Sequence, residues 1–219
     1  MKITKKKLKL LIEEVISELF LPDVMTPGFG DTYASEENIK LIEETELYDD
    51  LMSLLSNENL CVALVANAIH ESDSYDTLPY LKVNANGDCG SYAKDRFGAI
   101  DTSEYPEIFR TPTLGKCCSF GLFQYNICTS RAVGTQLLQY YGSDRDSSDQ
   151  EKIDLVMDYE NQINFIVHKV KQKFNTTEIK SINKWVELIV YRIERPADKA
   201  GSTLKRQKIA QKLKKRLIG

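Results

Sequence analysis

The segment LCVALVANAIH, residues 60–70, is a long apolar run that leads directly into ESDSY at residues 71–75. Apolar residues occupy nearly every position, which predicts a helix that is buried on all sides. Ser56 and Asn57, just before the run, are candidate N-caps for this helix. The buried helix would then end on a carboxylate, Glu71. Whether this carboxylate is solvated or partly buried decides whether it can have a catalytic role.

Two explanations fit Glu71. A solvated helix end would place the carboxylate in water and give it no special role. Alternatively, Glu71 continues the helix side that carries Leu64 and Asn67, because residues three and four apart share a face. A carboxyl at the rim of an apolar face loses hydration, so its pKa rises and it can keep a proton for catalysis. The helix pattern alone leaves both explanations open.

Size and composition are ordinary for a soluble globular protein. The 219 residues allow one domain with an appendage or two small domains, with 28% charged and 42% hydrophobic residues. The net charge of −3 argues against broad capture of nucleic acid, so no nucleic-acid partner is expected. No apolar run approaches the roughly 18–20 residues that cross a bilayer, so no membrane span is expected.

The N-terminal part predicts a separate element. Residues 1–21 carry an amphipathic helical stripe, and its glutamates interrupt the apolar run that a secretory signal needs. Its lysines precede its glutamates, against the helix dipole, so this helix should depend on packing against its own domain or a partner. Residues 22–35, rich in turn formers, predict a linker. Residues 36–219 would form the main domain, with a first helix from the Ser35 cap to about Leu55.

The main domain is predicted to be mainly α with a small β element near residues 75–95. Helical stripes recur in the last third of the chain, and Pro196 should end the second of those helices by Arg195. VNANGDCG, residues 83–90, has the turn chemistry of a hairpin. Its likeness to a calcium loop is faint because the distal glutamate is missing, and we expect no metal and no cofactor. Trp185 is predicted to be core, His70 structural, and His168 a surface or core residue.

The number of cysteines is odd, so not all of them can pair within the chain: Cys61, Cys89, Cys117, Cys118 and Cys128. No zinc-ligand spacing occurs among them. Cys61 lies in the apolar helix and is predicted to be a small buried residue. Cys89 could bridge to one of the other three, but the simpler interpretation is reduced thiols in a protein made in a cytoplasm.

A second candidate segment is KCCSFGLFQYN, residues 116–126. Gly121 permits close backbone approach, and the amides of Gln124 and Asn126 can hydrogen-bond a polar substrate. The aromatic residues between them, Tyr125 included, either offer flat faces to sugar rings or pack in the core. The segment alone does not decide between these alternatives.

The order of these motifs resembles that of a known family. A helix ending in ANAIHES, followed by SFGLFQYN, is similar to the lysozyme and lytic transglycosylase superfamily. The later segments DYENQINFIVHKV, KWVELIVYRIERPADKA and RQKIAQKL resemble the bacteriophage tail lysozymes, over about residues 55–215. The chain departs from that family in the residues after ES, in Tyr125 where tryptophan is usual, and in a longer 72–118 region.

The resemblance implies a lysozyme-like α+β fold and assigns roles by position. Glu71 would be the general acid, and Asp73 is one candidate for a second carboxylate. Glu194 and Arg195 in IERP would either face the cleft or form a structural ion pair, which is the favoured interpretation. The substrate cleft would be lined by Ser119, Gln124, Tyr125 and Asn126.

The function implied by the resemblance is a virion-associated peptidoglycan hydrolase, either a muramidase or a lytic transglycosylase. It would cut the β-1,4 bond between N-acetylmuramic acid and N-acetylglucosamine in glycan strands of the host cell wall. The N-terminal helix would hold it to phage tail or internal virion proteins during assembly in the host cytoplasm. The alternative is a lysozyme-like structural protein of the virion with little or no catalysis.

Overall fold

The computed structural model describes residues 40–218 apart from 76, 90–116, 128–131, 144–146, 179, 195 and 197. The described residues belong to one compact unit. In chain order they form β1 (Leu41–Glu43), α2 (Glu44–Leu55), α3 (Glu58–Glu71), β2 (Tyr80–Lys82), β3 (Asn86–Cys89), β4 (Cys117–Phe120), β5 (Tyr125–Asn126), α5 (Val133–Tyr140), α6 (Asp149–Met157), α7 (Tyr159–Lys173), α8 (Ile182–Ile189), η2 (Val190–Glu194) and α9 (Lys199–Leu217). The prediction of a mainly α fold with a small β element is therefore confirmed. The predicted N-terminal helix and linker, residues 1–35, lie outside the described residues.

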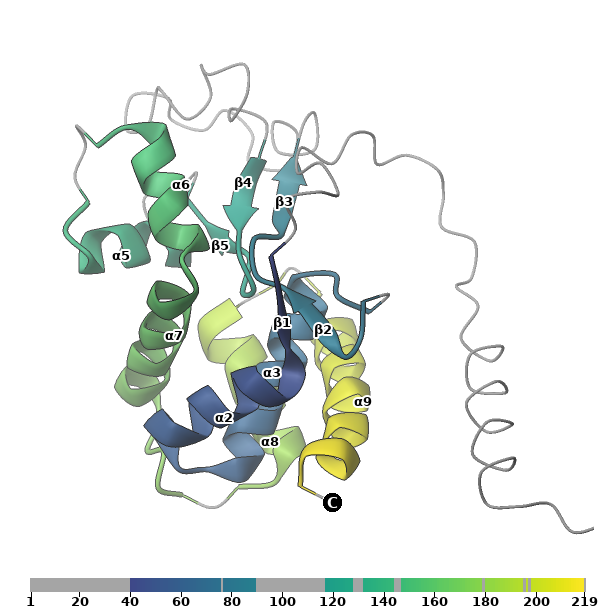
Figure 1. Cartoon of the computed structure of the whole chain (residues 1–219). Helices are drawn as coiled ribbons and strands as arrows, with labels where there is room; N and C mark the ends of the chain where they lie inside the picture. The colour runs from purple at the N-terminus through teal and green to yellow at the C-terminus, as the bar shows by residue number, and fades with distance from the viewer. Residues whose placement is uncertain are drawn as a thin grey trace, which may run out of the picture. The chain divides into compact units, whose positions relative to one another are not determined.

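Helix α3 lies at the centre of a group of helices and packs against α2, α8 and α9 (Figure 1). Every residue from Leu60 to Ile69 is buried, as expected for a helix that is apolar on all sides. The Asn57 side chain caps the helix by accepting a hydrogen bond from Leu60 N at 3.1 Å, which confirms one of the two predicted caps. Because the helix is enclosed along its length, its last residue, Glu71, has a fixed position.

The helix predicted from Ser35 to Leu55 begins later than expected. Residues 41–43 form strand β1, which pairs with β2 and places Leu41 opposite Lys82. The strand exposes its outer two residues and buries Ile42, so its alternation is that of a half-buried strand. Helix α2 starts only at Glu44 and ends as predicted at Leu55, followed by Ser56 in the left-handed conformation (φ 51°).

The prediction of a hairpin at residues 83–90, VNANGDCG, is wrong. Strand β2 ends just before this segment and strand β3 lies within it, but the two strands do not pair with each other. Strand β2 pairs with β1, whereas β3 pairs with β4, and β4 pairs with β5, all antiparallel. The segment after β2 therefore passes from one sheet to the other instead of turning back on itself. The actual tight hairpin is β4–β5, and its turn holds the GLFQ residues 121–124.

The helices of the last third follow the predicted stripes. Trp185 is fully buried, as predicted, and α8 continues into the π-helical turn η2, which ends at Glu194 before Pro196. Helices α5 and α6 were not predicted, because α5 has only eight residues and α6 has only nine, of which the first four are polar. Helix α6 does begin with a capping box formed by Ser148 and Glu151, a local signal in the sequence.

Two further expectations concern membranes and thiols. Within the described ranges, no helix has the length and apolar character that crossing a membrane requires. Cys61 is a free, fully buried thiol, as predicted. Cys118 is disulfide-bonded, so the interpretation of the cysteines as reduced thiols is wrong for this residue.

Candidate active site

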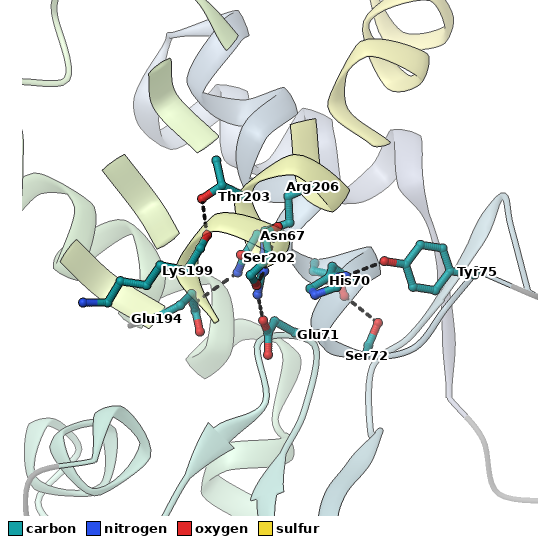
Figure 2. A network of polar contacts seen from close by, with 11 residues as sticks. Asn67, His70, Glu71, Ser72, Tyr75, Glu194, Lys199, Ser202, Thr203 and Arg206 are labelled. Atoms are coloured by element: carbon teal, nitrogen blue, oxygen red, sulfur yellow. Dashed lines mark hydrogen bonds and ion pairs between the residues drawn. The ribbon is translucent and has the colours of Figure 1, made fainter. Parts of the chain in front are cut away.

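Four polar side chains from three elements meet at the C-terminal end of α3 (Figure 2). We call this group the carboxyl centre, and it consists of Asn67 and Glu71 of α3, Glu194 of η2 and Arg206 of α9. Asn67 is fully buried and Arg206 is 1% exposed. Polar groups in such surroundings need hydrogen-bond partners, and the four side chains supply most of them to one another.

Arg206 is the cation that joins the centre. Its Nε donates a hydrogen bond to Asn67 Oδ1 at 2.7 Å, and its guanidinium forms an ion pair with Glu71. It also donates to the carbonyl oxygen of Ser202, at 3.3 Å, and to the Ser202 hydroxyl. Burial lowers the pKa of Arg206 to about 10, so the side chain remains charged at neutral pH.

Asn67 links the cation to a second carboxyl. Its Nδ2 donates a hydrogen bond to Glu194 Oε1 at 3.1 Å, while its oxygen accepts from Arg206. Arginine has only donors, so the amide oxygen must face Arg206 and the amide nitrogen must face Glu194. The predicted shared side of Asn67 and Glu71 is confirmed, because both contact the same guanidinium.

The surroundings of Glu71 differ from those that the apolar helix face predicts. Its side chain is 21% exposed and is paired with the buried Arg206, so Glu71 is neither a solvated helix end nor a desolvated acid. A neighbouring guanidinium stabilises the ionised carboxylate. The partial exposure leaves the carboxylate within reach of a ligand in solvent.

Glu194 has the properties that were expected of Glu71. Burial raises the pKa of Glu194 to about 7, and the hydrogen bond from Asn67 acts in the opposite direction. Glu194 also lies close enough to the β4–β5 hairpin to act on Tyr125, whose pKa is held well above its usual value by burial and by that carboxylate. The structure therefore gives Glu194 a partner on α3; the ion pair expected with Arg195 falls outside the described residues.

His70 is adjacent to Glu71 but takes no proton at neutral pH. Its Nδ1 is hydrogen-bonded to the hydroxyl of Tyr75. Burial lowers the pKa of His70 to about 4, and the charges of Arg206 and Lys205 act in the same direction. The ring is therefore neutral, in agreement with its interpretation as structural.

The serines after Glu71 fasten the end of α3 to β2. Ser72 Oγ donates to Ala68 O at 2.6 Å and lies 2.6 Å from Ser74 Oγ, which accepts from Lys82 N at 3.0 Å. Asp73, the candidate second carboxylate, is exposed with φ at 51°, and its carbonyl oxygen accepts from Lys82 Nζ at 3.3 Å. Asp73 therefore lies outside the carboxyl centre.

The predicted substrate-binding residues of the hairpin contact one another and the backbone. Asn126 Nδ2 donates to Ser119 Oγ across the two strands at 3.4 Å. Gln124, with φ at 45°, donates through Nε2 to Gly121 O at 3.0 Å and to Ala85 O at 3.2 Å. These side chains therefore stabilise the hairpin.

Gln162 of α7 anchors the same hairpin, and we call its contacts the Gln162 clamp. Its Oε1 accepts from Leu122 N at 2.6 Å, while its Nε2 donates to Val83 O at 3.1 Å and to Met157 O at 3.0 Å. A Cβ on Gly121, where φ is 83°, would lie 2.4 Å from Gln162 Oε1, so glycine is required there. Tyr125 is 1% exposed and donates through its hydroxyl to Gln162 O at 3.0 Å.

Asn67 and Arg206 were not recognised as site residues from the sequence, and Glu194 was expected either to face the cleft or to form a structural ion pair. A signal for Arg206 was present, because it shares a helix face with Ala210 and Leu213 and yet is charged. A charged residue on an apolar stripe is rarely buried without a partner, and here its partners come from α3.

The carboxyl centre combines a partly exposed carboxylate with a second carboxyl whose pKa is raised to about 7, and such a group can take up and release a proton near neutral pH. No cluster of three or more His, Cys, Asp or Glu side chains suited to a metal ion occurs among the residues that the structure describes. No protein-family model, no curated protein and no solved structure matches this chain.

Proposed function

We propose that this chain is a peptidoglycan glycosidase with a lysozyme-like domain, and that Glu71 is its catalytic carboxyl. The observation that supports this most is the connection of the partly exposed Glu71 to a second carboxyl, Glu194, through buried Arg206 and Asn67. Most glycosidases use two carboxyls, one to donate a proton to the leaving oxygen and one to stabilise positive charge or activate water. Burying charged groups costs free energy, so packing alone does not account for gathering them here.

The proposed substrate is the glycan strand of peptidoglycan, cut at the β-1,4 bond between N-acetylmuramic acid and N-acetylglucosamine. The ordered motifs around Glu71, the GLFQ turn and IERP support this substrate, and both muramidase and lytic transglycosylase products fit the centre. Under the same proposal the protein belongs to a phage particle, and residues 1–21 hold it to tail or internal virion proteins.

The test is the substitution Glu71→Gln, which keeps the size of the side chain and removes its charge. We expect the unaltered protein to release sugar fragments from purified peptidoglycan, and E71Q to release them about 10²–10⁴-fold more slowly, the range typical of proton-transfer groups. The matched control is Glu160→Gln, an exposed glutamate at the start of α7, which should retain full activity.

A structural virion protein is the second candidate function. The observation that favours it is that Tyr125, expected to line a cleft, is buried in the core and bonded to the main chain of Gln162, while Gln124 bonds the main chain at Gly121 and Ala85. If the unaltered protein and E71Q both release no fragments, this alternative replaces the glycosidase.

A further inference from the structure

We propose that Glu71 and Glu194 act as one acid–base unit that shares a single proton across Asn67 and Arg206. The proposal deepens the glycosidase function, and its catalytic part rests on that function. In this unit Glu71 is the carboxyl that reaches the substrate, while Glu194 is a positioning residue that acts through the buried bridge.

The count of charges is the first argument. Two carboxyls meet one guanidinium, so two ionised carboxylates would leave a net negative charge around the buried Asn67 amide. Electrostatic repulsion is stronger in the protein interior than in water, because the effective dielectric constant is lower. Retaining one proton makes the set neutral, and like carboxyls that share a site generally ionise one after the other.

The geometry also indicates which carboxyl holds the proton at rest. Glu71 contacts the cation directly, whereas the polar partner of Glu194 within the described part of the chain is the neutral amide of Asn67 (Figure 2). The ionised form is therefore better stabilised at Glu71 than at Glu194. The pKa of Glu194, raised to about 7 by burial, is consistent with this distribution.

Among the described residues, the other charged and titratable groups around the centre leave this count unchanged. Lys205, whose charge acts on His70, has an exposed side chain. His70 on α3 is neutral, and Tyr125 on β5 keeps its proton because its pKa is raised. Lys199, in the first turn of α9, directs its Nζ over the ring of Tyr191, 5.7 Å from the ring centroid. Arg206 is thus the cation that contacts both Glu71 and the amide bound to Glu194.

The proposed step conserves protons and charge. When substrate binds, the single proton of the unit is redistributed from Glu194 to Glu71 by exchange with solvent. Glu71 then donates it to the glycosidic oxygen, and the bond from that oxygen to the sugar C1 breaks with both electrons going to the oxygen. Glu71, now a carboxylate paired with Arg206, then faces a positively charged sugar ring, while Glu194 is ionised behind the Asn67 amide. Water or a hydroxyl of the substrate adds to C1 and returns one proton to the unit.

The sign of the pH dependence follows from the loss of this proton. Below about pH 7 the unit holds its proton, and above that pH both carboxyls are ionised, so activity should fall as pH rises through about 7. In Glu194→Gln the amide oxygen can still accept from Asn67, so the bridge remains, but Glu71 is left alone with Arg206. The alkaline limb of the pH profile should therefore move to lower pH.

The first experiment measures kcat/KM on purified peptidoglycan from pH 4 to pH 9. We expect a limb near pH 7 for the unaltered protein and for the E160Q control. For E194Q we expect a limb about one unit lower or more, and a roughly tenfold loss at pH 7, since one pKa unit is a factor of ten. If kcat/KM of E194Q is lower at every pH but its alkaline limb stays near pH 7, Glu194 has only a structural role and the proposal is overturned.

A second experiment does not depend on activity or on E194Q. Carboxyl carbons of isotopically labelled glutamates are followed by NMR as the pH is raised, in the unaltered protein and in E71Q. We expect one carboxyl to titrate near pH 7, and its pKa to fall in E71Q, because Arg206 is then no longer neutralised by Glu71. An unchanged titration in E71Q would refute proton sharing. If the unaltered protein cuts no peptidoglycan, the glycosidase function fails, and this titration still decides whether the carboxyls are coupled.

Discussion

The carboxyl centre and the Gln162 clamp are both buried polar clusters that join distant parts of the chain, yet they differ in chemistry. In the clamp a neutral amide bonds the main chain at Leu122, Val83 and Met157. In the carboxyl centre side chains bond other side chains, and three of the four members are ionisable. A neutral amide satisfies buried main-chain groups without the cost of desolvating a charge. The clamp is therefore explained by folding, whereas the carboxyl centre requires another reason, which we take to be catalysis.

The substitution expected to lower the free energy of unfolding most is Arg206→Met in the carboxyl centre. Methionine approximates the length of arginine but leaves Asn67 Oδ1 and the Glu71 carboxylate without their donor. Removing one partner of a buried ion pair typically costs about 3–5 kcal/mol, and we expect a value near the lower end because Glu71 is partly exposed. Urea denaturation would measure the change in the free energy of unfolding.

Lys208→Met is the matched control on the same helix, since Lys208 is exposed. It should change the free energy of unfolding by less than about 0.5 kcal/mol, as is usual for surface substitutions. An R206M protein as stable as K208M would mean that Arg206 does not hold the carboxyl centre together.

The clamp should respond to Gln162→Ala with a somewhat smaller loss. The substitution leaves Leu122 N and the carbonyl oxygens of Val83 and Met157 without their partner, although water can enter part of the space. At about 1–3 kcal/mol for a buried polar group left unsatisfied, we expect a loss of about 2–4 kcal/mol. The loss should be nearly independent of pH, because the clamp carries no charge; a steep pH dependence would contradict this account.

The smallest expected effect is the pH dependence that Glu194 gives to stability. Its pKa is about 7 in the folded protein against a usual 4.5, so between these values the folded state binds more protons than the unfolded state. The free energy of unfolding therefore falls as pH rises from 4.5 to 7. After allowance for solvent screening, we expect the unaltered protein to lose about 2 kcal/mol relative to E194Q over this range. The measurement is the free energy of unfolding of both proteins from pH 5 to pH 8. If it changes with pH equally in the unaltered protein and in E194Q, Glu194 does not cause the pH dependence.

The parts of the fold that the sequence predicted are those set by local pattern. The run from Leu60 to Ile69 has one interpretation only, and Asn57 is a recognisable cap, so the helix and the position of Glu71 at its end were both expected. The start of α2 was missed because β1 owes its extended form to pairing with β2, about 40 residues later in the chain.

The candidate site was less predictable, because its members meet only through tertiary packing. Arg206 contacts Asn67 across 139 positions of sequence, and no local pattern specifies that contact. The hairpin shows the same limit, since Tyr125 has an aromatic ring suited to a sugar and is nevertheless core. Contact with the buried cation, rather than residue type, distinguishes Glu71 from Glu194.

The π-helical turn η2 has a consequence for how the protein tolerates insertions and deletions. Such a turn bonds residue i to i+5 and so contains one residue more than an α-helical turn. Loss of one residue between Val190 and Ile193 would let the segment wind as regular α-helix and leave Glu194 at about the same angle around the helix axis, whereas regular winding of all five residues would turn Glu194 by roughly 100° away from its amide partner. The hydrophobic stripe of α8 would be untouched. The position of Glu194 beside Asn67 thus depends on how a single turn is wound.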